Sequence, residues 1–264
     1  MTNAAAMPGR RVLGVEVLIV LGVSLGASAL FSALRLAERL TRAEALSEQT
    51  AALNVPQVRE RPWFDLAFQL LDVAVGLVPV LLALYLLDRY PGSGARLIGF
   101  DWRRPRFDFG SGAVLAAVIG IPGLALYVVA VHLGIGVRLV PSALESYWWT
   151  VPVLILAALQ NALVEEVVGV GYLLRRLQEL GWPIAAMVAA QALLRGSYHF
   201  YQGFGGFLGN AVMGVVFALF YLRFRRVMPL VIAHSLLDVV AFVGYGLWGE
   251  QLDAALAEVL SWLP

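Results

Sequence analysis

Two adjacent glutamates, Glu165 and Glu166, lie inside the stretch NALVEEVVGVGYLL, which is otherwise almost wholly apolar. A charged side chain in a membrane span costs about 2.5–3.5 kcal/mol on insertion scales, so such residues are first considered as functional. Other ionisable side chains follow in similarly apolar surroundings: Arg195, His199, His234 and Asp238. Carboxylates and imidazoles gathered in this way suit acid–base chemistry.

Peptide hydrolysis is one reaction that needs such a set. It requires a base to deprotonate water, a donor for the tetrahedral oxyanion and a proton for the leaving amine. A glutamate in apolar surroundings suits the first and last tasks, and imidazoles can orient the water or donate to the oxyanion. The signature of zinc proteases is missing, because the sequence has no His-Glu-x-x-His helix.

The composition indicates that these residues lie in a membrane. The chain is 60% hydrophobic and 14% charged, with a mean hydropathy of +0.79, whereas a soluble domain is about half apolar and a quarter charged. Stretches long enough, or nearly long enough, to cross a bilayer are 12–36, 64–87, 111–133, 151–174, 183–202, 205–222 and 228–248. We therefore predict an all-α, polytopic transmembrane helical bundle of about seven spans, with the site in the last four.

The charged residues outside the spans predict the orientation and the partners. Arginines cluster in the loops that lie on the cytoplasmic side if the N-terminus is inside, so we expect a multi-pass plasma-membrane protein with a cytoplasmic N-terminus. The net charge of +1 gives no basic face for nucleic acid. The expected partners are the lipid bilayer and a peptide or membrane-protein substrate. Every basic residue is arginine, which is typical of a GC-rich bacterial genome.

Three segments on successive apolar helices, EEVVGVGYLLRRL, LLRGSYHFYQG and MPLVIAHSLLDVVAF, resemble the CPBP family of intramembrane proteases. This family groups the type II CAAX prenyl endopeptidases with bacterial bacteriocin-processing and immunity proteins. The resemblance implies that Glu165 activates water, that Glu166 is its partner and that His199 assists the base. It also implies that His234 and Asp238 form the pair on the oxyanion side.

The resemblance also defines the expected organisation of the chain. We expect a single structural domain in which residues 1–110 form N-terminal transmembrane helices and interfacial segments. Residues 111–248 would form the CPBP-like protease core, and residues 249–264 a C-terminal surface helix. Because protein prenylation is chiefly eukaryotic, the resemblance does not imply CAAX substrates for a bacterial chain.

Two positions depart from the family pattern. The arginine expected four residues after Glu166 is Val170, and the phenylalanine expected four residues before His199 is Arg195. We interpret the two departures as one exchange, in which Arg195 reaches across from the next helix to neutralise Glu166. The alternative is that both departures mark an inactive member of the family.

Further residues are expected to support the site. An ionised Asp238 only accepts hydrogen bonds, so we expect it to hold His234 charged as the donor to the oxyanion. Asn161 and Asn210 are candidates to donate hydrogen bonds to the residues of the site. Their alternative role is to form hydrogen bonds that hold neighbouring helices together. At 1.5 Å per residue, His199 meets Glu165 at one depth only if the fifth span is tilted, short or broken near Gly196.

The cofactor and the functional class stay open. No cofactor is required, but Glu165, His199 and His234 could bind zinc or another divalent metal with water as the fourth ligand. Buried Glu, His and Arg could instead form the relay of a proton-coupled transporter. A third possibility is a catalytically inactive immunity or scaffold protein. The crowding of polar residues into one half of the chain favours the enzyme, because transporters often repeat such features in both halves.

Overall fold

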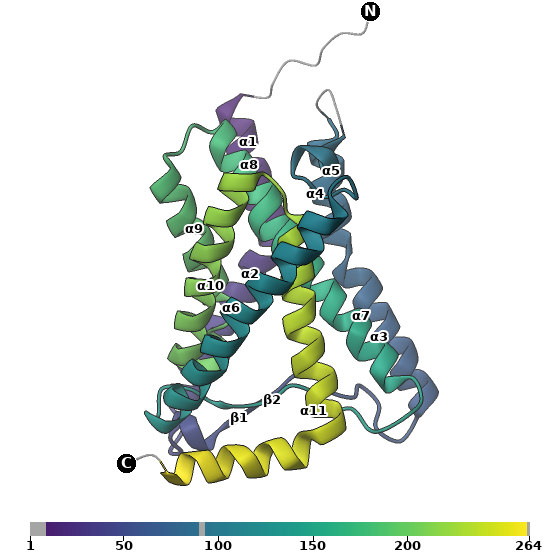
Figure 1. Cartoon of the computed structure of the whole chain (residues 1–264), viewed down its shortest axis with the longest axis vertical. Coiled ribbons are helices and arrows are strands. Elements are labelled where there is room, and N and C mark those ends of the chain that lie inside the picture. The colour runs from purple at the N-terminus through teal and green to yellow at the C-terminus, as the bar shows by residue number, and fades with distance from the viewer. Residues whose placement is uncertain (1–8, 90–92, 263–264) are drawn as a thin grey trace, which may run out of the picture.

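The computed structural model describes residues 9–89 and 93–262, which form a bundle of long helices (Figure 1). The predicted N-terminal region and surface helix therefore extend in part outside the described residues. In chain order the elements are α1 (Arg10–Gly22), α2 (Leu25–Leu40), η1 (Leu46–Glu48), β1 (Thr50–Ala52), α3 (Pro62–Gly76), α4 (Val78–Leu87), α5 (Gly94–Leu97), α6 (Pro105–His132), β2 (Arg138–Val140), α7 (Thr150–Leu163), η2 (Val164–Tyr172), α8 (Leu173–Glu179), α9 (Ile184–Ser197), η3 (Phe200–Gln202), α10 (Gly203–Phe224) and α11 (Met228–Trp262).

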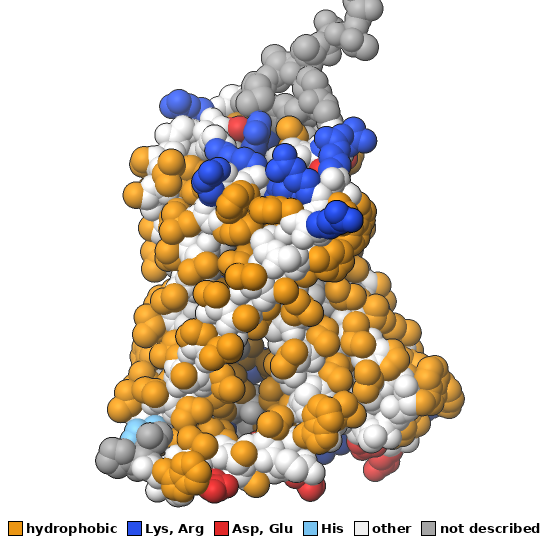
Figure 2. Space-filling model, in the orientation of Figure 1, with side chains coloured by type: hydrophobic (Ala, Val, Ile, Leu, Met, Phe, Trp, Pro, Cys, Tyr) orange, Lys and Arg blue, Asp and Glu red, His pale blue; other side chains and the backbone are white. Residues whose placement is uncertain are grey.

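The predicted polytopic helical bundle is confirmed. Within the described residues, five helices are long and apolar enough to cross a membrane: Pro62–Leu87, Pro105–His132, Thr150–Glu179, Phe200–Phe224 and Met228–Trp262. Apolar side chains cover the middle of the molecule in Figure 2, while arginines gather at one end. The remaining two of the seven predicted spans depart from straight, full-length helices.

The first predicted span is bent. Helices α1 and α2 meet at an angle of 51°, and the hydroxyl of Ser24 between them donates to the carbonyl of Val20 at 2.6 Å. Gly26 permits this bend, because a Cβ at that position would lie 2.7 Å from the carbonyl oxygen of Leu21. The bend lets α2 run beside η3 and α9, where the candidate histidine lies.

The fifth predicted span is short, as the depth of His199 required. Helix α9 has 14 residues and ends at Ser197, and the chain turns back at Gly203, whose φ is +86°. Gly196 allows α10 to pack closely, because a Cβ there would lie 2.7 Å from the Phe207 ring. The expected break near Gly196 is confirmed, and it leaves His199 in a turn inside the protein.

One feature that the sequence analysis missed is a small parallel sheet. Strand β1 pairs with β2 in the register Thr50↔Arg138, Ala51↔Leu139 and Ala52↔Val140. A separate apolar cluster holds it in place: Leu36, Leu46, Ala51 and Val137. The sheet lies at the end of the bundle opposite α5 and the start of α1 (Figure 1).

The last helix also changes direction. Helix α11 has a non-helical residue at Trp248 (φ −134°, ψ 27°), and the segment after it lies across the end of the bundle near β1 and β2 (Figure 1). We predicted a surface helix over 249–264, of which residues 263–264 lie outside the described part. The division of the chain into an N-terminal region, a core and this helix stays a prediction.

Candidate active site

The two glutamates lie on a π-helical segment, η2, which continues α7 without a break. Short π-helical insertions are rare and are frequent at functional sites. Glu166 has no exposed side-chain surface, whereas 13% of the Glu165 side chain is exposed. Adjacent helical residues point in different directions, and here one carboxylate faces the protein interior while the other borders a cavity.

Arg195 contacts both carboxylates. Its Nη1 lies 2.8 Å from Glu166 Oε1, and its Nη2 lies 3.2 Å from Glu165 Oε2. The guanidinium is fully buried and lies over the ring of Phe217, 5.1 Å from the ring centroid. The predicted pairing of Arg195 with Glu166 is confirmed. The structure adds that the same guanidinium also contacts Glu165, which the sequence analysis did not anticipate.

His234 lies between two acids. Its Nδ1 lies 2.7 Å from Glu166 Oε1, and its Nε2 lies 3.6 Å from Asp238 Oδ1. Because a carboxylate only accepts hydrogen bonds, we assign the Nδ1 proton to the bond with Glu166. Nε2 is then the ring nitrogen beside the cavity, and a proton there would be stabilised by Asp238.

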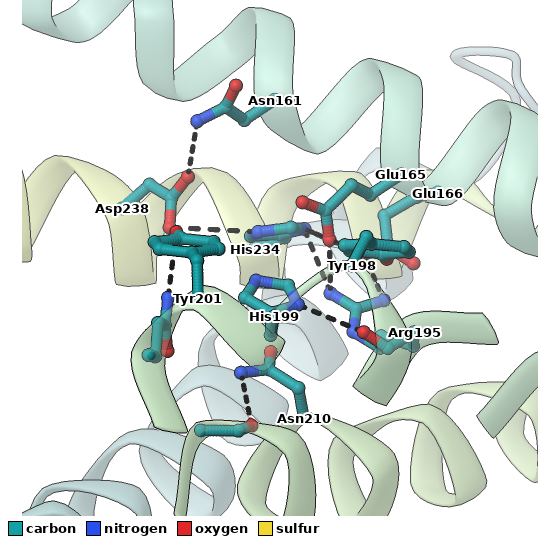
Figure 3. A network of polar contacts seen from close by, with 12 residues as sticks. Asn161, Glu165, Glu166, Arg195, Tyr198, His199, Tyr201, Asn210, His234 and Asp238 are labelled. Carbon is teal, nitrogen blue, oxygen red and sulfur yellow. Dashed lines mark hydrogen bonds and ion pairs between the residues drawn. The ribbon is translucent and has the colours of Figure 1, made fainter. Parts of the chain in front are cut away.

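Asp238 in turn accepts a hydrogen bond from a side chain of α7. The amide of Asn161 lies 3.4 Å from Asp238 Oδ2, so a helix that carries Glu165 one turn later is linked to α11. Figure 3 shows Asn161, Asp238 and His234 following one another toward the two glutamates. The structure thus brings Asn161 to the cluster, and its supporting role stays a prediction.

Tyr198 is a site residue that the sequence analysis missed. Its hydroxyl donates to Glu165 Oε2 at 2.8 Å, and its ring lies 4.7 Å from that of His199. Its position directly before His199, in the quoted segment LLRGSYHFYQG, was the available signal. A tyrosine in an apolar span has many roles, so the sequence alone did not identify this one.

His199 lines the same cavity but takes a different contact from the one expected. Its Nδ1 lies 3.0 Å from the carbonyl oxygen of Arg195. Because that carbonyl can only accept, Nδ1 carries the proton and Nε2 is the acceptor of the neutral ring. The ring also stacks against that of Tyr201 at 6.1 Å. These contacts fix one orientation of the imidazole beside the cavity.

Asn210 is not joined to the cluster by its amide. The amide donates to the carbonyl of Gly206, one turn earlier in α10, at 3.0 Å. Asn210 lines a separate, largely apolar cavity between α6 and α10. The contact within its own helix explains how this polar side chain is satisfied in a span, so the structure offers no direct support for its predicted role.

A cavity of about 810 Å³ borders the cluster. Its walls come from α2, the segment around β1, α7, η3 and α11, and the ionisable or polar side chains include Glu165, Tyr198, His199, His234 and Asp238. Carboxylates, imidazoles and a tyrosine around one hollow can bind and activate a small polar molecule such as water. The convergence expected from the sequence is therefore present.

The expected metal ligands do not form one group. Among the described residues, the ligand atoms that lie within 4.8 Å of one another belong to Glu165, Glu166 and His234, and His199 is not among them. The two carboxylates of that group already bind Arg195 at 2.8 and 3.2 Å. A guanidinium so close to these oxygens would repel a divalent cation, so the arrangement fits an arginine better than a metal.

Comparison with known proteins covers part of the chain. Residues 147–240 match the family model described as type II CAAX prenyl endopeptidase Rce1-like. This range contains the whole cluster, from Asn161 to Asp238. No curated protein and no solved structure matches the chain.

Proposed function

Because residues 147–240 belong to the CPBP family of intramembrane proteases, we propose that the chain hydrolyses a peptide bond of a membrane-associated peptide or protein. The family is one of intramembrane CAAX-type proteases. The single observation that carries the proposal is the position of Glu165. It borders the cavity while two neighbouring groups, from Tyr198 and Arg195, hold one of its oxygens.

Those groups define which oxygen acts. Tyr198 and Arg195 both contact Glu165 Oε2, at 2.8 and 3.2 Å, and His234 Nδ1 lies 3.9 Å from the same oxygen. We therefore assign Oε1 to the water. A carboxylate held in this way acts as a general base, which typically accelerates a reaction about 10²–10⁴-fold. The Nε2 atom of His199 is available to accept a second hydrogen bond from the water and to orient it.

The steps balance without a further reactant. Glu165 takes a proton from the water as its oxygen bonds to the carbonyl carbon of the substrate. A proton on His234 Nε2, stabilised by Asp238, donates a hydrogen bond to the oxyanion. Glu165 then gives its proton to the leaving nitrogen as the carbon–nitrogen bond breaks. The products are a new carboxyl terminus and a new amino terminus, and the glutamate returns to its ionised form.

Arg195 and Glu166 have a positioning role in this proposal. Arg195 offsets the charge of two adjacent carboxylates, and Glu166 fixes the proton of His234 on Nδ1. Removing one partner of a buried ion pair costs about 3–5 kcal/mol, because the other charge is left uncompensated. These side chains are therefore needed for the geometry of the site even though neither contacts the substrate.

The experiment compares membrane proteomes of cells that carry the wild type or Glu165→Gln, searching for new peptide termini near membrane anchors. Asp72→Asn is the matched control, since Asp72 is an exposed carboxylate in α3 and lies outside the cavity lining. We expect termini that need Glu165 and are unaffected by Asp72→Asn. Identical termini in all strains would contradict the proposal.

The same variant separates the alternatives. A proton-coupled transporter would show flux in proteoliposomes that Glu165→Gln abolishes without any proteolysis. An inactive scaffold or immunity protein would keep its cellular phenotype in Glu165→Gln cells.

A further inference from the structure

The cavity beside Glu165 is closed toward one end of the bundle. The residues that follow the glutamates in η2 are fully buried, including Val167, Val168 and Val170. Leu25 packs tightly against this segment, because a Cβ added at Gly169 would lie 2.8 Å from its Cδ1. A peptide therefore has no route to Glu165 along α8.

The cavity extends in the opposite direction. On α2 its lining residues, Ser28, Ser32, Arg35 and Arg39, follow one helical face. Ser32 marks the depth of the site, since its hydroxyl accepts from the backbone N–H of Tyr201 at 2.7 Å. Arg39 lies about 10 Å further along the helix axis, at 1.5 Å per residue. The lining side chain of Arg35 is exposed, so the cavity opens at this end.

The charge distribution assigns the two ends to the two sides of the membrane. The arginines at the closed end are Arg10, Arg11, Arg89, Arg96, Arg103, Arg104, Arg106, Arg175, Arg176, Arg223, Arg225 and Arg226. Those at the open end are fewer: Arg35, Arg39, Arg42, Arg59, Arg61 and Arg138. Figure 2 shows the same contrast, with basic side chains at the end where α1 begins and acidic ones at the other. Arginine-rich loops remain in the cytoplasm, so the cavity opens on the outer side.

A strand edge lies in this opening. The residues that flank β1, Gln49 and Leu53, both bond to β2: the N–H of Arg138 donates to the carbonyl of Gln49 at 2.9 Å, and the N–H of Leu53 donates to the carbonyl of Val140 at 2.8 Å. Because backbone groups alternate along a strand, those of Ala52 point to the edge away from β2. Ala52 is exposed and lines the cavity. Extended peptides bind to such edges by adding a strand.

We propose that the site takes its substrate from the outer face of the membrane, as an extended peptide segment that pairs with the backbone of Ala52 on the outward edge of β1 on its way to Glu165. The neighbouring carbonyl on this edge, that of Thr50, is already bound by Arg39 at 3.0 Å. This inference rests on the proposed hydrolysis and adds the side and the conformation of the substrate. It predicts that the substrates are membrane-anchored proteins cut in a segment exposed outside the cytoplasm. The small side chain of Ala52, on the cavity side, leaves room for such a strand.

Single cysteines test the side of access, because the natural chain has no cysteine. The probe is a charged maleimide that does not cross membranes, applied to intact cells and then to permeabilised cells. We expect Arg35→Cys and Ala52→Cys to react in intact cells, and Arg103→Cys and Arg223→Cys, at the closed end, to react only after permeabilisation. The reverse pattern would overturn the inference whatever the enzyme cleaves.

The strand edge is tested by Ala52→Pro, which removes the outward N–H, with Ala52→Ser as the control that keeps it. One backbone hydrogen bond contributes about 0.5–1.5 kcal/mol, so we expect Ala52→Pro to lower production of the Glu165-dependent termini about two- to tenfold. Equal output from the two variants, at equal thermal stability, would overturn the role of the edge.

The positions of the new termini separate the two claims. Termini that depend on Glu165 and lie in outer segments support both. Termini in cytoplasmic segments would overturn the inference and leave the proposed hydrolysis intact. If the cysteines at residues 35 and 52 react from outside but cells produce no termini that depend on Glu165, the proposed function is overturned. The assignment of a peptide substrate is then overturned with it.

Discussion

Arg195 Nη1 lies 2.8 Å from Glu166 Oε1 in an ion pair from which solvent is fully excluded. The guanidinium comes from α9, whereas the resemblance to the CPBP family led us to expect one on the helix of the glutamates, at the position of Val170. Here Val170 is completely buried in the apolar core. The guanidinium that pairs with the second glutamate therefore lies on a neighbouring helix, as the interpretation of the two departures as one exchange predicts.

The first prediction concerns this pair. Glu166→Arg and Arg195→Glu should each abolish activity, because each leaves like charges buried together, at a cost of about 3–5 kcal/mol or more. Combining the two substitutions should restore part of the activity, because opposite charges face each other again. The measurement is the yield of Glu165-dependent termini at equal expression. A double variant no better than either single variant would refute the exchange.

The second prediction concerns Asp238, which lies 3.6 Å from His234 Nε2. Asp238→Asn should keep activity within about tenfold, since an amide can donate to the oxyanion as well as accept. Asp238→Leu should lower kcat about a hundredfold, because it neither donates nor stabilises a proton on His234. Similar losses in the two variants would show that the charge itself is required.

The third prediction concerns Tyr198. Its hydroxyl bonds to Glu165 Oε2 at 2.8 Å, and a hydrogen bond to a charged group contributes about 1.5–3 kcal/mol. Tyr198→Phe should therefore lower kcat about ten- to a hundredfold while the thermal unfolding temperature changes little. Tyr201→Phe is the control, because Tyr201 lines the cavity and bonds to Gln202 rather than to a glutamate. Equal effects of the two substitutions would argue against a role for Tyr198 in holding the base.

The fourth prediction concerns metal. Because Arg195 binds the carboxylates of the possible ligand group, treatment with a chelator should leave the hydrolysis of an identified substrate unchanged. Activity lost on chelation and recovered on adding zinc would show instead that a metal replaces the guanidinium contacts in the working enzyme.

The fifth prediction concerns stability at the arginine-rich end, where Arg226 contacts Asp101 at 3.0 Å. Burial opposes ionisation of Asp101, but hydrogen bonds from the Arg103 backbone and from Arg226 outweigh it, so its pKa lies below the usual value. A depressed pKa stabilises the fold above the unfolded-state value, and this contribution is lost as pH falls through the folded-state value. Asp101→Asn should lower the unfolding temperature at pH 7 and have less effect near pH 3. A difference independent of pH would contradict this account.

Much of the site was predictable because its side chains are rare in apolar helices. Glu166 and Arg195 could be recognised as candidate site residues because a charged side chain in an apolar span is costly. Their pairing was predicted because an arginine expected at residue 170 is missing and one is present at residue 195. The depth of His199 required a short or broken helix, and the glycines around residue 196 indicated where it ends.

Other parts depended on contacts that a single sequence does not specify. The β1–β2 pair joins three-residue strands far apart in the chain, and such short strands have no periodic pattern. Tyr198 differs from the other tyrosines of the spans only in its contact with the Glu165 carboxylate, which the sequence does not reveal. The π-helical geometry of residues 164–172 arises within a continuous helical pattern, so the shared contact of both glutamates with Arg195 was not foreseen.

The most direct measurement uses purified protein in proteoliposomes with a peptide that spans a cleavage site found in cells. We predict that Glu165→Gln lowers kcat at least a hundredfold, the scale of a lost general base, while Asp72→Asn has no effect and all proteins unfold at similar temperatures. Cleavage by folded Glu165→Gln at the wild-type rate would contradict the assignment of Glu165 as the residue that activates water.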